Sequence, residues 1–335
     1  MNLGGTIRLN SLGLCLILGL FMIFLLYMTK FSSLSEEEKP ADVNLRNILI
    51  AAVEAAERGG KEIVNAKKGN IVEKTKGKTK EGANIPVTNA DLTSHCVMYN
   101  GLQDAFPTVS VFSEETQANC EKSPPLELVP SVDKGMDDLV DHFVSGEDLA
   151  IWIDPLDATY EFTENLLQYV STMVCVAYKG NPIIGVIHKP FVKEPRTTWA
   201  WVNTGSSPHI KSYREIKKRP TVIVSRSHAG HVKEIAKEAI GADVEVISAG
   251  GAGYKVLELL SGNATAYVHS TKIFKWDICA GHAIVTAARG QMTTLANQPI
   301  YYSRASEPSN SQGVLATMDK HQWYADKFKT ILDQL

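Results

Sequence analysis

Two aspartates flank a proline and a leucine in the stretch Asp154-Pro155-Leu156-Asp157, which directly follows an apolar segment. Proline pushes the residue before it into an extended conformation, so we expect Asp154 to end a strand and the chain to turn at once. Carboxylates this close repel each other unless they share a proton or a cation. The stretch therefore predicts a site for a cation or for a shared proton, although a plain turn has the same sequence pattern.

Further acidic residues stand at the ends of expected elements. Glu114 and Glu115 follow the short apolar segment 109–112, and Asp277 opens a helix expected over 277–289. Open sheets bind ligands in the crevice beyond the carboxyl ends of their strands. An oxygen-rich set without cysteine or histidine partners suits Mg²⁺. Taken singly, these residues also fit a helix cap or solvated surface glutamates.

The composition is that of an ordinary globular protein. The 335 residues are 44% hydrophobic and 21% charged, and the net charge of -3 gives no reason to expect nucleic-acid binding. The five cysteines show neither C-x-x-C spacing nor the density of a disulfide scaffold, so we expect no zinc site and leave open whether any of them pair. The cysteines are Cys15, Cys96, Cys120, Cys175 and Cys279.

The amino terminus contains a run of 17 residues without a charge, Leu12–Met28. As a helix it covers roughly 25 Å, a slightly short membrane span. A cleavable signal peptide is the alternative, but its apolar core is normally shorter. We expect a cytoplasmic tail over 1–11, a transmembrane signal anchor over 12–28 and a stalk over 29–41.

One glycosylation sequon starts at Asn263, and it is usable only if the domain enters the secretory lumen. With a single amino-terminal span it predicts a type II membrane protein whose catalytic mass is luminal. The short span suits a thin membrane such as that of the endoplasmic reticulum or Golgi.

The rest of the chain divides into two patterns. Over 42–205 we expect a first helix capped by Asp42, a lysine-rich loop or ribbon over 61–81, and several strands in an α+β half. Over 206–335 strands and helices alternate, which predicts an α/β half. The lysine-rich segment carries seven lysines against three glutamates and could steer a multiply charged anion, or it is a solvated surface segment.

A glycine-rich stretch, residues 250–253, precedes an expected helix. Free backbone N–H groups at a helix start attract anionic oxygen, and Lys255 adds a cation. Ser225 and His228 follow the strand expected over 221–224, so they face the same crevice. A glycine-rich connection with a solvated lysine and a structural histidine is the alternative.

The order E-E, D-P-L-D-A-T, W-D-I-C-A resembles the lithium-sensitive, magnesium-dependent phosphatases of the inositol monophosphatase superfamily, over roughly residues 42–320. Residues 160–164, 224–228 and 250–255 resemble the branch that removes the 3'-phosphate from 3'-phosphoadenosine 5'-phosphate, and the chain is most similar to the Golgi-resident type. The resemblance implies an α/β fold, the layered αβαβα sandwich of the inositol monophosphatase and fructose-1,6-bisphosphatase type.

The resemblance also implies roles for single residues. It implies two or three Mg²⁺ ions, inhibition by Li⁺, and a catalytic pair, Asp91 and Thr159, that orients and deprotonates the attacking water. The implied metal ligands are Glu114, Asp154, the Leu156 carbonyl, Asp157 and Asp277. The implied substrate contacts are Ser225, His228, Gly251 and Lys255. Ala158 replaces the usual glycine, as it also does in the Golgi-type enzymes, and strains the turn by about 1 kcal/mol if the position needs a positive φ.

The function that the resemblance implies is hydrolysis of 3'-phosphoadenosine 5'-phosphate to AMP and phosphate in the Golgi lumen, which supports sulfation of glycosaminoglycans. An inositol phosphate phosphatase is the nearest alternative. A membrane-tethered metal-binding scaffold without turnover is an alternative of another class. The oligomeric state is left open, a homodimer included.

Overall fold

The structure is a computed structural model, and it describes residues 11–34, 42–78, 84–116, 120–129, 135–194, 196–210, 219–227 and 231–332. The chain divides into two units, Met1–Ala41 and Asp42–Leu335. In the first unit the apolar segment forms helix α1 (Ser11–Leu34). No helix within the described ranges is long and apolar enough to cross a membrane. The anchor expected over 12–28 is therefore not supported.

Six strands form the first sheet of the second unit, in the order β10-β9-β8-β7-β6-β4. Strands β4 and β6 run parallel, and the other neighbours are antiparallel. The strands are β4 (Ser110–Ser113), β6 (Leu149–Asp157), β7 (Ser171–Tyr178), β8 (Asn181–Lys189), β9 (Arg196–Trp201) and β10 (Gly205–Ser206).

Strand β6 is buried on both faces, and its side chains alternate between two cores. Ile151 and Ile153 pack with helices on one face, whereas Ala150 and Trp152 pack into the central core of the molecule. This alternation follows from the two-residue period of a strand. The run of apolar residues before Asp154 is thus explained by a strand covered on both sides. The expectation that this strand ends at Asp154 is wrong, because β6 continues to Asp157 with an irregular pairing to β7 between the two aspartates.

Five strands form the second sheet, in the order β12-β11-β13-β17-β15. Strand β11 is parallel to both of its neighbours, and β17 is antiparallel to both of its own. Ile223 and Tyr267 face the central core, whereas Val222 and Val224 face an outer core. The strands are β11 (Thr221–Ser225), β12 (Glu245–Ala249), β13 (Ala266–His269), β15 (Gln291–Thr293) and β17 (Val314–Thr317).

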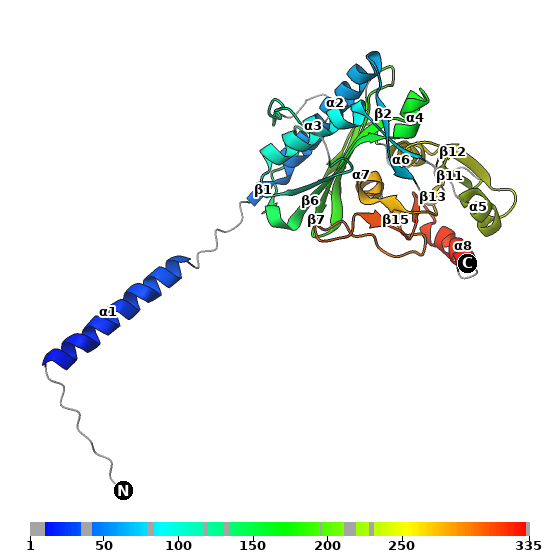
Figure 1. Ribbon diagram of the computed structural model, residues 1–335. Helices are drawn as coiled ribbons and strands as arrows, with labels where there is room; N and C mark the ends of the chain where they lie inside the picture. Colours follow the sequence, from blue (N-terminus) through cyan, green and yellow to red (C-terminus); the bar gives the residue numbers. More distant parts are fainter. Residues whose placement is uncertain are drawn as a thin grey trace, which may run out of the picture. The chain divides into compact units, whose positions relative to one another are not determined.

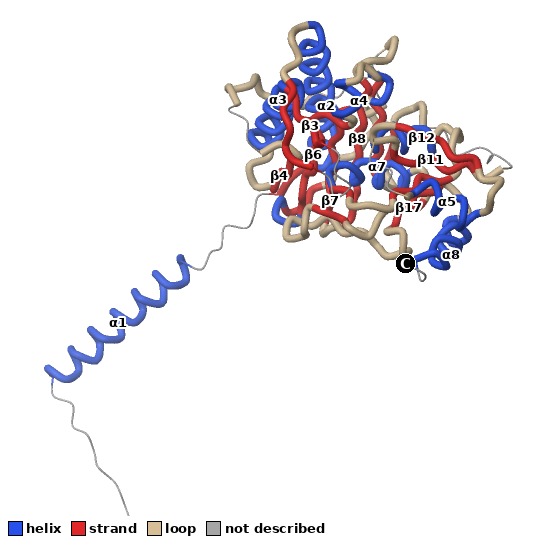
Figure 2. The backbone as a smooth tube through the Cα atoms, turned by 45° about the vertical axis from the view of Figure 1, so that its right-hand side comes forward, coloured by secondary structure: helices blue, strands red, loops and turns tan. Residues whose placement is uncertain are grey.

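The helices form three layers around these two sheets (Figure 1). Helices α2 and α3 cover the outer face of the six-stranded sheet, α6 and α7 fill the space between the sheets, and α5 and α8 cover the far face of the five-stranded sheet. The view in Figure 2 shows the same order of layers. The helices are α2 (Leu45–Lys68), α3 (Asn89–Ala105), α4 (Thr159–Thr163), α5 (Val232–Ile240), α6 (Ala252–Leu260), α7 (Lys275–Ala287) and α8 (His321–Leu332). The αβαβα sandwich expected from the sequence is confirmed.

Three strand pairs lie outside the two sheets. They are β1 (Asp42–Asn44) with β5 (Phe143–Ser145), β2 (Glu73–Lys78) with β3 (Asn84–Thr88), and β14 (Ile273–Phe274) with β16 (Ser309–Asn310).

Two expectations about the start of the second unit are corrected. Asp42 does not cap the first helix, because it belongs to strand β1; instead Asn44 Oδ1 accepts from Arg46 N at 3.0 Å. The lysine-rich segment is a ribbon only in its second part, β2 with β3, because α2 continues to Lys68 and ends at Gly69.

Four of the cysteines form two disulfides. Cys96 of helix α3 bonds to Cys120, and Cys175 of strand β7 bonds to Cys279 of helix α7. Cys15 of helix α1 is free and exposed.

Candidate active site

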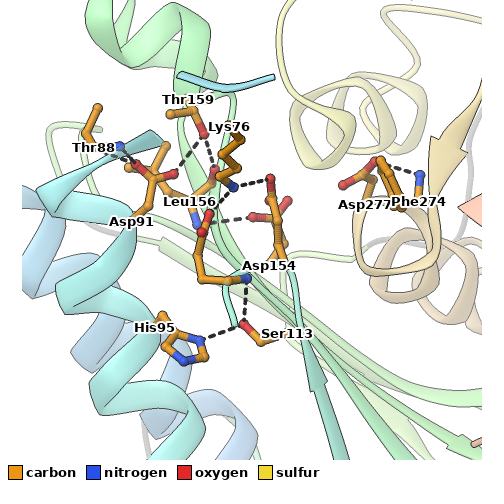
Figure 3. A network of polar contacts seen from close by, with 12 residues as sticks. Lys76, Thr88, Asp91, His95, Ser113, Asp154, Leu156, Thr159, Phe274 and Asp277 are labelled. Carbon is orange, nitrogen blue, oxygen red and sulfur yellow. Dashed lines mark hydrogen bonds and ion pairs between the residues drawn. The ribbon is translucent and has the colours of Figure 1, made fainter. Parts of the chain in front are cut away.

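Three carboxylates that lie far apart in the sequence meet at one corner of the central layer. Glu114, Asp154 and Asp277 each offer an oxygen, and these oxygens all lie within 4.8 Å of one another. Asp154 lies in β6 at the point where the pairing with β7 becomes irregular, and Glu114 follows β4. Because β4 and β6 run parallel, both acids lie at the same edge, where Glu114 N donates to Ile153 O at 3.2 Å. Asp277 comes from the first turn of α7, where its Oδ2 accepts from Phe274 N at 3.0 Å (Figure 3).

The electrostatics of this cluster fit a hard cation. Burial raises the pKa of Asp154 well above its usual value, and the charge of Glu114 raises it further. Burial and the same glutamate raise the pKa of Asp277 in the same way. Carboxylates at this spacing, with Asp154 buried and Glu114 and Asp277 partly buried, tolerate their charges only if a cation or a shared proton offsets them. Because all three donors are carboxylate oxygens, the set suits Mg²⁺.

Asp91 and Thr159 form a hydrogen-bonded pair beside the cluster (Figure 3). Thr159 Oγ1 lies 2.9 Å from Asp91 Oδ1 and 3.0 Å from Leu156 O, so it can donate to either oxygen. Asp91 Oδ2 accepts from Thr88 N at 2.7 Å and from Thr88 Oγ1 at 2.6 Å. Burial raises the pKa of Asp91 to about 6, although the Thr88 bonds act against the shift. A carboxylate with this pKa can accept a proton near neutral pH.

Ala158 has a positive φ, which is the condition under which alanine strains the turn at this position. Its φ is 71° and its ψ is 44°, in the left-handed region, directly before helix α4. This turn places Thr159 next to Asp91. The position does need a positive φ, so alanine pays a conformational cost of about 1 kcal/mol there.

Asp157 has a different environment from the other acids. Its Oδ1 accepts from Ala252 N at 2.9 Å, and its Oδ2 accepts from Gly253 N and Ser171 Oγ, each at 2.9 Å. It is not among the three carboxylates within 4.8 Å of one another. The backbone N–H groups of residues 252 and 253 thus bind an internal carboxylate, whereas the sequence led us to expect free groups there.

The glycines before α6 make this contact possible. Gly251 has a φ of 66°, and a Cβ there would lie 2.9 Å from Asp157 Oδ2. A Cβ at Gly253 would lie 2.6 Å from Ser171 Oγ. The glycine-rich stretch therefore lets the start of α6 approach the D-P-L-D turn closely.

A cavity of about 310 Å³ joins the acids to the expected substrate residues. Ser225, Gly251 and Lys255 line it together with Asp154 and Asp277. Lys255 is buried, and its Nζ donates to Gly251 O at 2.6 Å. Burial lowers its pKa, although the charge of Asp157 acts against the shift. His228 lies outside the described residues.

Two residues of the site were not assigned to it by the sequence. Lys76 of the β2–β3 ribbon donates from Nζ to Glu114 Oε1 at 3.0 Å and also bonds to Glu115 Oε1 (Figure 3). Burial lowers the pKa of Lys76, but the charges of Glu114 and Glu115 outweigh this effect and raise it above the usual range. Tyr267 lines the cavity, is fully buried, and has no hydrogen-bond partner for its hydroxyl within the described part of the chain. The lysines at every second position of β2 were the sequence signal that could have assigned Lys76 to the site. No sequence signal pointed to Tyr267.

Comparisons with known proteins identify the family of this chain. The model of the inositol monophosphatase family matches residues 44–331. The chain is 44% identical over 330 residues to inositol monophosphatase 3 of Danio rerio, and the alignment covers 93% of this chain and 93% of that protein. It is 43% identical over 327 residues to the Golgi-resident adenosine 3',5'-bisphosphate 3'-phosphatase of Rattus norvegicus, and the alignment covers 89% of this chain and 90% of that protein.

A solved structure with low sequence identity shares the fold. The extragenic suppressor protein suhB from Bartonella henselae superposes with a TM-score of 0.62 at 18% identity, over 84% of this chain and 98% of that chain. The fold, the family match over nearly the whole second unit and the two full-length relatives all agree. The chain belongs to the inositol monophosphatase family and is a phosphoric monoester hydrolase.

Proposed function

We propose that this chain hydrolyses the 3'-phosphate of 3'-phosphoadenosine 5'-phosphate, giving AMP and phosphate. The observation that carries the proposal is one cavity that combines the carboxylate cluster and Thr159, which is hydrogen-bonded to the buried Asp91 behind it, with cationic and apolar walls. A second phosphate calls for cations, and the cavity offers Lys78, Lys255 and Lys272.

The apolar wall favours a nucleotide over an inositol phosphate. Ile85, Pro86 and Tyr160 line the cavity, and the Tyr160 side chain is 40% exposed, so its ring is accessible to a planar base. An inositol ring carries hydroxyls on every carbon and gains little from such a surface. The name of the Rattus norvegicus relative supports the nucleotide, whereas the name of the Danio rerio relative supports the inositol phosphate.

The chain's own residues would perform the proton transfer. Thr159 donates its hydroxyl hydrogen to Asp91, so its oxygen can accept from a water molecule and hold that water in line with the phosphorus. Asp91 then receives the proton as the water attacks. Glu114, Asp154, Asp277 and the Leu156 carbonyl would hold two or three Mg²⁺ ions, with Asp157 at the edge of the site. When bound, these ions supply positive charge that lowers the pKa of water and stabilises the leaving oxygen.

A luminal address in the Golgi belongs to the same proposal, and the name of the Rattus norvegicus relative supports it. Two disulfides suit an oxidising compartment. The sequon residue Asn263 is exposed in the turn after α6, where its Nδ2 donates to Glu258 Oε2 at 2.8 Å. Supply of AMP and removal of the bisphosphate would support sulfation there.

The test compares two substrates on the purified full chain. We expect faster hydrolysis of 3'-phosphoadenosine 5'-phosphate than of inositol 1-phosphate, loss of both with EDTA, and inhibition by Li⁺. Asp154→Asn serves as the inactive control, because it removes a carboxylate from the cluster. Preference for inositol 1-phosphate would reject the nucleotide, and hydrolysis of neither substrate in Mg²⁺ would favour a metal-binding scaffold.

A further inference from the structure

The Cys175–Cys279 disulfide joins helix α7, which carries Asp277 of the cluster, to strand β7, the neighbour of the strand that carries Asp154. On helix α7, Cys279 is two residues after Asp277. On strand β7, Cys175 lies directly opposite Trp152 of β6, two residues before Asp154. The disulfide therefore links the helix of one acid to the strand beside the other acid.

Both sulfur atoms lie in the central core, between the two sheets. Cys175 and Cys279 are fully buried, and their Cα atoms are 5.6 Å apart. On the next strand, a Cβ at Gly185 would collide with the carbonyl oxygen of Ala280, so α7 lies very close to the sheet at this point. The covalent bond and the closest approach of helix to sheet thus occur at neighbouring residues.

The other contacts of α7 constrain its position along its axis less strictly. Its buried side chains, such as Ile278 and Ile284, make apolar contacts, which are not directional. Hydrogen bonds also join α7 to residues 302–308: Lys275 N donates to Pro308 O at 2.9 Å, and His282 Nδ1 lies 3.0 Å from Tyr302 Oη.

A metal centre requires ligand positions held to about 0.5 Å. Asp154 belongs to a strand of the six-stranded sheet and Glu114 directly follows another, whereas Asp277 lies on α7, so its position depends on how α7 is held.

We propose that the Cys175–Cys279 disulfide is a positioning element of the metal centre, which holds α7 so that Asp277 stays within reach of Glu114 and Asp154. This inference rests on the proposed metal-dependent function. The second disulfide provides a matched comparison, because Cys96–Cys120 joins α3 to a loop and neither cysteine neighbours an acid of the cluster.

The test measures Mn²⁺ binding by calorimetry on folded full-length protein, and does not rely on turnover. We expect the Kd for Mn²⁺ to rise about tenfold or more in Cys175→Ala/Cys279→Ala, the range found when residues that orient metal ligands are removed. In Cys96→Ala/Cys120→Ala the Kd should stay within about twofold of the wild type. Thermal unfolding in EDTA shows that each variant is folded at the temperature of the titration.

Each result decides a separate question. If the wild type binds Mn²⁺ and both double variants bind it equally well, the positioning role is wrong while the proposed function stands. If the wild type itself binds no Mn²⁺, the proposed metal-dependent function is rejected, and the positioning role is rejected with it. Cys175→Val/Cys279→Ala, which refills the core, is the second variant. If neither version without the bond folds, the disulfide stabilises the fold as a whole and the proposal is overturned.

Discussion

Replacing Ala158 by glycine tests how the structure positions the catalytic threonine. Ala158 has φ 71° and ψ 44°, and a residue with a Cβ pays roughly 1 to 2 kcal/mol in this region. Glycine pays no such cost, but it loses about 0.4 to 1 kcal/mol of stability through the greater freedom of the unfolded chain. The net expectation is a gain of about 0.5 to 1 kcal/mol in the free energy of unfolding.

Chemical denaturation by urea in EDTA measures this change, and calorimetry should show a rise in Tm of roughly 2 °C for a chain of this size. Because the turn keeps its backbone conformation, we expect hydrolysis at no less than the wild-type rate. Ala66→Gly is the matched control, since Ala66 lies in the right-handed helix α2. There the same chemical change should cost about 0.5 to 1 kcal/mol.

The two substitutions should change the free energy of unfolding in opposite directions, and this difference decides the test. A loss of stability in Ala158→Gly equal to that in Ala66→Gly would refute the assignment of a left-handed backbone to this turn. Ala158→Val adds a branched side chain at the same φ and should destabilise more than either change.

Four further predictions concern the buried polar groups of the second unit. Asp154→Asn should abolish Mn²⁺ binding. It should leave the metal-free protein at least as stable in urea as the wild type, because burial and the charge of Glu114 raise the pKa of Asp154. A marked loss of stability of this variant in EDTA would contradict this. Asp91→Asn should lower kcat by about 100-fold or more while the Kd for Mn²⁺ changes little, and an unchanged kcat would remove Asp91 from the proton transfer. Tyr267→Phe should raise the free energy of unfolding by about 1 kcal/mol, because the substitution removes a buried hydroxyl that has no hydrogen-bond partner within the described part of the chain. If the hydroxyl did have a partner, urea denaturation would show a lower free energy of unfolding instead. Burial lowers the pKa of His282 to about 4, with the charge of His321 acting in the same direction, so the unfolded chain binds the proton more tightly. Stability should therefore be complete above about pH 6.5 and fall by roughly 3 kcal/mol as the pH drops to 4. His282→Gln should flatten this part of the profile in pH-dependent urea denaturation.

The strand that carries Asp154 could be predicted from the sequence because several local signals agree there. The apolar run predicts the buried strand, and the proline marks the point where its pairing becomes irregular, but the strand continues to Asp157 and the turn comes at Ala158. The parallel pairing of β4 with β6 then brings Glu114 to the same edge. That pairing follows general rules for sheets, so the meeting of these two acids was within reach of the sequence.

Long-range contacts decide the features that the sequence did not predict. Asp42 and Asn44 are both good helix caps, and the pairing of β1 with β5, about a hundred residues away, selects Asn44. Asp157 accepts from residues 252 and 253, which no local pattern links to it. Two disulfides among four cysteines can form in three ways, and only the packing of α7 on β7 selects the observed pair.

Anomalous diffraction from crystals of the protein grown with Mn²⁺ tests most directly whether the acids from three distant segments form one metal centre. The structure predicts a manganese peak bonded to oxygens of Glu114, Asp154 and Asp277 together. A map with no peak between these three side chains, or with its peaks elsewhere in the chain, would contradict the metal centre and the hydrolysis derived from it.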